Sequence, residues 1–199
     1  MAFFLFQFAF ADTCSTITSG AMVGRTGFVG DLIYSVGVSG FIYPIIGHWV
    51  WGPGGWLSKP HSGVFLRDFA GSSVVHTMGG MIALTGAIAL GPRLGRKFKR
   101  DGGGLSAMTI IYRRIKKWDM GITINGFLGG LVAITAPCYW VNSFGSIVIG
   151  LIGGIVVVYG IDFIEWLRID DPIGAVAVHG LAGIWGTWSV GLFATGQYG

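Results

Sequence analysis

Two histidines, His76 and His179, lie inside long runs of apolar residues, where an ionisable side chain is unusual. A histidine in hydrocarbon needs hydrogen-bond partners, and its charged form carries a large desolvation cost. The neutral ring is therefore expected, with one nitrogen that donates a hydrogen bond and one that accepts. Two such rings in contact could relay a proton. The simpler alternative is that each ring only bonds a neighbouring helix.

A repeated motif contains both histidines. The pattern D-x-x-G-x-x-x-V-H-x-x-x-G begins at Asp68 and again, at a constant offset, at Asp171. At 1.5 Å per helical residue, each histidine lies ~12 Å from its aspartate, near the middle of a hydrocarbon layer ~30 Å thick. If the copies enter a membrane from opposite faces, they form an inverted repeat with a site near the midplane. A chance match between glycine-rich helices is the alternative.

The composition predicts that most of the chain lies in a membrane. Hydrophobic residues make up 52% of the chain and charged residues only 11%, whereas a soluble domain carries about a quarter charged residues. Six apolar stretches approach the length of about 20 helical residues that crosses a bilayer: Ala2–Val23, Phe28–Trp49, Phe69–Gly91, Met120–Val141, Gly145–Phe163 and Pro172–Thr195. We therefore predict an all-α fold, a polytopic transmembrane helical bundle with inverted repeats.

The basic residues follow the order of the predicted spans. Of the 13 Lys and Arg residues, only Lys59 and Arg67 fall on the opposite side from the Gly24-Arg25 turn. Positively charged loops mark the cytoplasmic face, so this turn is predicted to be cytoplasmic. The net charge of +4 then reflects membrane orientation, and we expect no nucleic-acid partner. The predicted location is the cell (plasma or inner) membrane, with the lipid bilayer as a partner.

One connection does not fit a complete membrane domain. Between the basic clusters at 93–100 and 113–117, the apolar segment Leu105–Tyr112 is too short to cross a bilayer. We expect residues 1–199 to form one membrane domain from which an even number of spans is missing between Asp101 and Arg113; a short surface segment is the alternative. The chain also begins in an apolar run and stops at Gly199 without a polar tail, which favours an incomplete version.

Further residues with distinctive chemistry lie at the predicted outer mouth. Trp51 follows the second span, and Asp68 stands at the head of the third. A tryptophan face attracts cations and a carboxylate adds negative charge, so the two could concentrate a small cation before entry. Asp68 can equally cap a helix that starts at Phe69. The sequence has no zinc-binding spacing, phosphate loop or nucleophile motif, so we expect no metal, no cofactor and no enzymatic activity.

Several segments together resemble one known family. They are Phe-Gln-Phe-Ala-Phe-Ala-Asp at 6–12, Ser-Gly-Ala-Met-Val-Gly-Arg at 19–25, Gly-His-Trp-Val-Trp-Gly at 47–52, Asp-Phe-Ala-Gly-Ser-Ser-Val-Val-His at 68–76, Gly-Pro-Arg-Leu-Gly-Arg at 91–96, Ile-Thr-Ile-Asn-Gly-Phe-Leu-Gly-Gly-Leu-Val-Ala-Ile-Thr-Ala-Pro-Cys at 122–138, and Asp-Asp-Pro followed by Ala-Val-His-Gly within 170–180. In this order they resemble the ammonium transporter (Amt/Mep/Rh) family over nearly the whole chain. The resemblance implies a homotrimer of eleven-helix subunits, each with its own pore.

The resemblance also implies roles for particular residues. Trp51 resembles the tryptophan that recruits ammonium at the outer mouth, and Asp68 resembles the aspartate that supports this site, with the carbonyl of Ala70 nearby. Phe10 is similar to one of two stacked gate phenylalanines, and the two histidines resemble the paired pore histidines. The second gate phenylalanine and an outer serine belong to a family helix with the pattern W-F-G-x-N-x-G-S, which has no counterpart in this sequence.

Together these features predict transport of ammonium or ammonia. A bare ammonium ion in hydrocarbon is costly, whereas ammonia is neutral. The pore is therefore expected to capture ammonium outside, remove its proton near the histidines and pass ammonia. One alternative is a membrane ammonium sensor with the same pore, which a signalling domain downstream of Gly199 would favour; another is a bis-histidine haem site. The family resemblance implies a cytoplasmic PII-type regulator as a further partner.

Overall fold

The computed structural model describes residues 1–59, 65–98 and 120–196, and within these ranges it contains helices and turns but no strand. The helices are α1 (Ala2–Met22), α2 (Phe28–Gly37), η1 (Val38–Ile42), α3 (Tyr43–Trp51), η2 (Ser72–Thr77), α4 (Met78–Leu90), α6 (Met120–Ile134), α7 (Ser143–Trp166), η4 (Val176–Leu181) and α8 (Ala182–Phe193). The η segments are π-helical and continuous with the α-helices beside them. The predicted all-α fold is confirmed.

Helices occupy all six predicted spans. Within the described part of the chain, four are long and apolar enough to cross a membrane: Phe28–Trp51, Ser72–Leu90, Ser143–Trp166 and Val176–Phe193. α1 has the length, with 21 residues, but it is less apolar because it carries Gln7, Asp12 and several hydroxyl side chains. α6 has only 15 residues. The predicted gap between Asp101 and Arg113 lies outside the described residues.

The end of α6 differs from the prediction. The sequence predicts a span that continues to Val141, whereas α6 ends at Ile134. Pro137 has no amide hydrogen and disfavours helical geometry in the residue before it, so the chain turns here. The carbonyl group of Thr135 accepts a hydrogen bond from the amide of Ala70 instead, at 2.9 Å. The end of α6 is therefore bonded to the turn that precedes η2.

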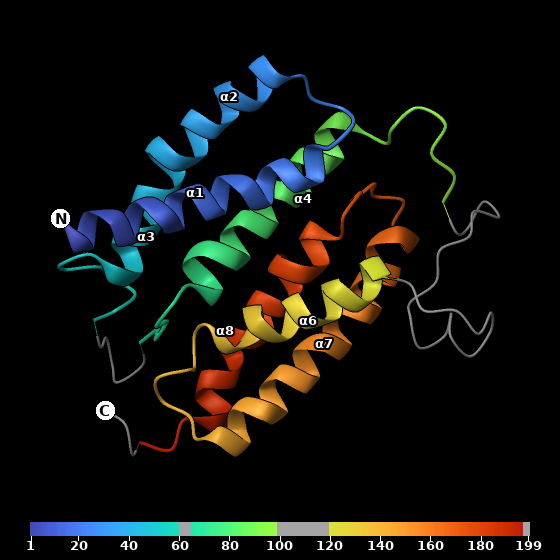
Figure 1. Ribbon diagram of the computed structural model, residues 1–199. Coiled ribbons are helices and arrows are strands. Elements are labelled where there is room, and N and C mark those ends of the chain that lie inside the picture. The colour runs from blue at the N-terminus through green and yellow to red at the C-terminus, as the bar shows by residue number, and fades with distance from the viewer. Residues whose placement is uncertain (60–64, 99–119, 197–199) are drawn as a thin grey trace.

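Successive spans run in alternating directions through the bundle (Figure 1). α1 packs along α4, and α6 packs along α7 and α8. The η2–α4 and η4–α8 segments contact each other and join the two groups of helices. Because α4 and α8 run in opposite directions, the two copies of the repeated motif enter from opposite ends of the bundle, as the sequence predicts (Figure 1).

Glycine lets the helices approach closely at two places. At the α6–α7 contact, a Cβ atom on Gly153 would lie 2.7 Å from the carbonyl oxygen of Gly129. At the centre, a Cβ atom on Gly80 of α4 would lie 2.3 Å from the amide nitrogen of Gly180 in η4. Both distances are shorter than real Cβ atoms tolerate, so only glycine fits. The second contact holds the two backbones together directly beside the histidines.

Candidate functional site

The two histidines lie in contact at the centre of the bundle. Nδ1 of His76 lies 3.1 Å from Nδ1 of His179, a hydrogen-bond distance. The rings are nearly parallel, with 12° between their planes and 5.2 Å between their centroids. The bond requires one Nδ1 to donate and the other to accept. Two nitrogens bound on opposite sides of a haem iron would lie ~4 Å apart, so the geometry does not fit a bis-histidine haem iron between them.

The same type of turn precedes each histidine. The carboxylate of Asp68 accepts hydrogen bonds from the four successive amides of residues 71–74, at 2.7 to 3.0 Å. Asp171 accepts from the amides of residues 175 and 176, at 2.9 and 2.7 Å. Three residues after each aspartate, Gly71 and Gly174 have positive φ angles of 104° and 77°, which glycine adopts readily. The repeated motif therefore fixes where each helix starts and how deep each histidine lies.

This turn shows one of the two compatible roles expected of Asp68. The residue is only 6% exposed, and both carboxylate oxygens bond backbone amides at the helix start. Burial raises the pKa of its carboxyl group, and the amide bonds lower it in part. The helix begins at Ser72, later than the predicted Phe69, because the chain first turns through Gly71. In this structure the carboxylate of Asp68 caps the helix.

Aromatic side chains gather where the outer mouth is predicted. Trp51 is the last residue of α3, and its indole nitrogen donates to the main-chain carbonyl of Asp68 at 2.6 Å. The ring of Phe10 meets the Trp51 ring edge-on, with 5.6 Å between centroids. Phe6, which the sequence analysis did not single out, lies 4.5 Å from Phe10 by the same measure. The structure therefore brings together Phe10, Trp51 and the backbone that leads to Ala70.

A charged cluster at the opposite end of the bundle was missed by the sequence analysis. The buried carboxylate of Asp170 accepts hydrogen bonds from Nε and Nη2 of Arg93, at 2.8 and 3.0 Å. Arg96 bonds Glu165, and its Nε lies 3.4 Å from Asp170. Arg25 donates to the carbonyl oxygen of Asp170 at 2.7 Å. In the sequence these arginines indicate only membrane orientation, although the consecutive acidic residues Asp170 and Asp171 were a usable sign of an ion pair.

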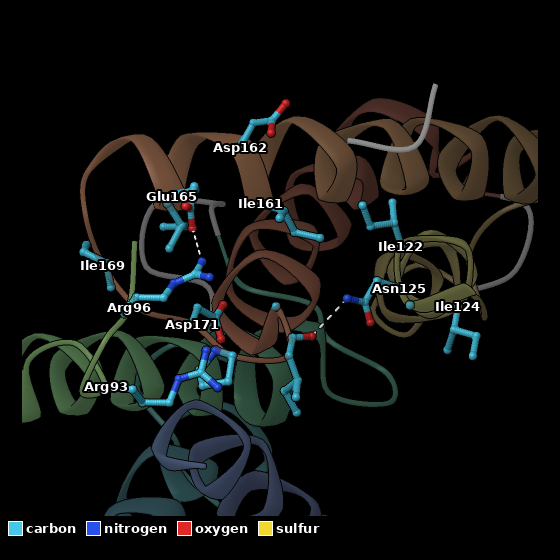
Figure 2. A pocket seen from close by; sticks show the side chains of 15 residues that line it. Arg93, Arg96, Ile122, Ile124, Asn125, Ile161, Asp162, Glu165, Ile169 and Asp171 are labelled. Carbon is cyan, nitrogen blue, oxygen red and sulfur yellow. Dashed lines mark hydrogen bonds and ion pairs between the residues drawn. The ribbon is translucent and has the colours of Figure 1, made fainter. Parts of the chain in front are cut away.

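The arginine cluster borders a cavity of about 380 Å³ between α6, α7 and the turn before η4. Figure 2 shows Arg93 and Arg96 on one side of this cavity and Asn125 on the other. The side-chain amide of Asn125 donates to the carbonyl of Ile173 at 3.0 Å. The two consecutive aspartates here have different roles, because Asp170 binds arginines and Asp171 caps η4.

Replacing Asp170 with asparagine should make the protein less stable at neutral pH and less sensitive to acid. Burial alone would raise the pKa of Asp170, but its bonds to Arg93 and the nearby charge of Arg96 outweigh this and hold the pKa below its usual value. A lowered folded-state pKa gives stability that is present above the unfolded value of about 4 and is lost as the pH falls below it. We expect a loss of about 1 to 3 kcal/mol at neutral pH.

Thermal unfolding in detergent between about pH 3 and pH 7 measures this effect. The wild-type melting temperature should fall steeply at the acid end, and that of Asp170→Asn should fall less. Parallel pH profiles for the two proteins would show that the charge of Asp170 adds no stability.

Sequence comparison identifies the family. The family model described as Ammonium Transporter Family matches residues 1–103 and 100–199. The chain belongs to the Ammonium Transporter Family. One curated relative is Ammonium transporter Amt2 of Archaeoglobus fulgidus. It is 40% identical to the chain over 253 aligned residues, which cover 98% of the chain and 54% of Amt2. Ammonium transporter 1 member 1 of Solanum lycopersicum is 32% identical and covers 98% of the chain and 54% of that relative.

Solved structures agree with this assignment. The structure titled "Sensor Amt Protein" superposes with a TM-score of 0.85 and 32% identity, over 100% of the chain and 62% of that protein. Candida albicans Mep2 superposes with a TM-score of 0.77 over 94% of the chain and 51% of Mep2; at 24% identity it supports the fold alone. The ammonium transporter family member thus spans about half the length of the curated relatives it matches. It is a multi-pass protein of the cell membrane, from a family of transport proteins that are not enzymes.

Proposed function

We propose that this chain carries the ammonium pathway of a membrane transporter. Ammonium is recruited at Trp51, supported by the Asp68 turn and the carbonyl of Ala70, and passes Phe10. It then gives up its proton at His76 and His179, and ammonia continues. Family membership supports ammonium as the substrate.

The hydrogen bond between the two histidines is the observation that carries this proposal. The rings meet at 3.1 Å on helices that enter from opposite ends of the bundle. Each ring uses Nδ1 for the other, so two further nitrogens are left for a substrate or a proton. Passing neutral ammonia instead of ammonium avoids the cost of a bare cation in hydrocarbon. Deprotonation at the pair is therefore the step that makes crossing feasible.

The recruitment role of Trp51 rests on its aromatic surroundings. Its ring is fixed by the bond to the Asp68 carbonyl and by the edge of Phe10. A fixed electron-rich ring face attracts a small cation at about 0.5 to 2 kcal/mol. Because the Asp68 carboxylate is bonded to four amides, it contributes here by holding the turn and the Trp51 partner carbonyl in place.

Uptake of labelled methylammonium into liposomes that contain the chain tests the proposal. Replacing His76 and His179 together with leucine should lower uptake by at least about tenfold, because no proton acceptor is left at the midplane. His48→Gln is the matched control, since His48 is an exposed histidine of α3 outside the pair. Undiminished uptake by the double variant would refute the relay, and absence of uptake by the unaltered chain would refute transport.

A second candidate function is ammonium sensing. It is favoured by the likeness to the structure titled "Sensor Amt Protein", at 32% identity over the whole chain. A sensor binds ammonium at the same residues and passes the signal to another domain. Ammonium binding to liposome-reconstituted protein without methylammonium uptake would favour this function over transport.

We also propose that helices are missing between Asp101 and Arg113. The family model matches in two stretches that meet at residues 100–103. The alignment with Amt2 runs over 253 positions, more than the 199 residues of the chain, so Amt2 has residues without a counterpart.

A homotrimer fits the apolar side chains exposed on α6 and α7, among them Phe127, Leu131 and Leu151. A PII-type regulator at the cytoplasmic face remains a proposal from the family resemblance.

A further inference from the structure

A cavity of about 330 Å³ lies between α1 and the η4 segment, beside the histidine pair. Its polar lining consists of Asp12, Thr13 and Thr16 from α1 and of His179 from η4. The remaining lining side chains are apolar. The proposed pathway uses His179 but assigns no role to the other three polar groups.

Asp12 is the unexpected member of this group. It lies near the middle of α1, a 21-residue helix without another charged side chain. A carboxylate within a membrane span is costly and usually serves a function. No hydrogen bond or ion pair to Asp12 occurs among the described residues, whereas the other aspartates that flank the pathway, Asp68 and Asp171, are bonded to helix-start amides. Asp12 is exposed at the edge of the cavity, and its oxygens can accept a proton or a hydrogen bond from it.

The ring of His179 has a nitrogen that can exchange a proton with the Asp12 carboxylate. Its Nδ1 bonds His76, which leaves Nε2 as the ring nitrogen for the cavity that this side chain lines. The hydroxyl of Thr13 donates to the carbonyl of Ala9 at 2.8 Å and keeps lone pairs that can accept. A space of this size between a carboxylate, hydroxyl groups and an imidazole is large and polar enough for water molecules to bridge them.

We propose that Asp12 is a proton-binding residue that exchanges a proton with His179 across this cavity; the proposal deepens the proposed function. Ammonium loses one proton to the imidazole and becomes ammonia, and the imidazole passes one proton to the Asp12 carboxylate. The carboxylate becomes a neutral carboxylic acid, and the imidazole ends in its initial state. The carboxyl group thus stores the proton that would otherwise leave a charged imidazole in hydrocarbon.

Few other titratable groups face this site. Of the elements packed against α1, η2 carries His76, which bonds His179, and α3 carries Tyr43 and His48. The Tyr43 hydroxyl donates to a glutamine of α1 at 2.8 Å, and His48 is exposed at the outer end of α3. α4 and η1 carry no ionisable side chain. Cys14 of α1 itself is buried in the apolar core cluster that includes Ile17. α7, which packs against η4, carries Asp162 and Glu165, and these line the cavity at the arginine cluster. Among the described residues, His179 is therefore the group to which Asp12 should couple.

Infrared titration of the chain in liposomes, without ammonium, tests the exchange. The protonated-carboxyl absorption that appears on acidification should contain a component that is lost in Asp12→Asn and kept in Asp12→Glu, while the absorption of the other carboxyl groups stays the same. Asp31→Asn is the matched control, because Asp31 of α2 bonds the Tyr34 hydroxyl and lies away from the cavity. Addition of ammonium at a fixed neutral pH should then strengthen the Asp12 component in the wild type and not in His179→Asn, because the imidazole is the group that passes the proton to the carboxylate.

The result separates this inference from the proposed function. Identical spectra for the wild type and Asp12→Asn, or an ammonium response that is the same with and without His179, would overturn the proton exchange. Both expected changes in a chain that takes up no methylammonium would support the exchange and refute transport. Normal methylammonium uptake without either spectral change would support transport and refute the exchange.

Discussion

Replacing Gly80 with alanine should push α4 away from η4 and break the hydrogen bond between the histidines. A Cβ atom on Gly80 would lie 2.3 and 2.4 Å from the amide nitrogen and Cα of Gly180. Both are backbone atoms, so no side-chain rotation relieves the clash. Forcing extra volume into a packed core costs about 1 to 3 kcal/mol, which exceeds the helix-propensity gain of about 1 kcal/mol for glycine to alanine. The His76–His179 contact lies beside this crossing and should open with it.

The opposite side of the same crossing gives a matched control. A Cβ atom on Gly180 would lie 3.6 Å from the nearest backbone atoms of Gly80, which is ordinary van der Waals contact. Gly180→Ala should therefore be as stable as the wild type, although it adds the same methyl group at the same interface. Thermal unfolding in detergent compares the three proteins, and methylammonium uptake reports on the pair. Equal melting temperatures for Gly80→Ala and Gly180→Ala would contradict this account of the crossing.

The sequence was sufficient to predict the spans and the meeting of the histidines because both depend on local spacing. Apolar runs of membrane length placed all six helices, and equal distances from Asp68 and Asp171 placed the two rings at one depth. These inferences need only helix rise and bilayer thickness. They do not need the packing of any side chain.

Features that depend on long-range contacts were not predictable in the same way. α6 ends early because of Pro137 and because its last turn bonds the turn at Ala70. The apolar run continues past this proline, so the run alone predicted a longer helix. The Arg93–Asp170 pair joins residues far apart in the sequence. The distribution of basic residues along the chain therefore predicted the membrane orientation but not this ion pair. A role for Asp12 could not be predicted from the sequence, because only the folded structure places its carboxylate and the His179 ring on the same cavity.

Replacing Asp68 with alanine should destabilise the protein more than any other single change at the two repeated turns. Its carboxylate accepts hydrogen bonds from four successive amides, and each buried donor left without a partner costs about 1 to 3 kcal/mol. Some of these amides can find water at the mouth, so we expect a total loss of about 3 to 5 kcal/mol. The start of η2 should fray, and the Trp51 indole should lose its carbonyl partner on the same turn.

Variants at the two turns separate helix capping from direct cation binding by Asp68. Asp171→Ala should cost less, because this carboxylate accepts from two amides at bonding distances of 2.9 and 2.7 Å. Asp68→Asn keeps one acceptor oxygen and should fall between the wild type and Asp68→Ala, a loss of about 1 to 2 kcal/mol. The measurement is unfolding in detergent without ammonium, where a residue that only binds substrate has no effect. If Asp68→Ala unfolds like the wild type there but no longer binds ammonium, the carboxylate acts on the cation and the capping account is wrong.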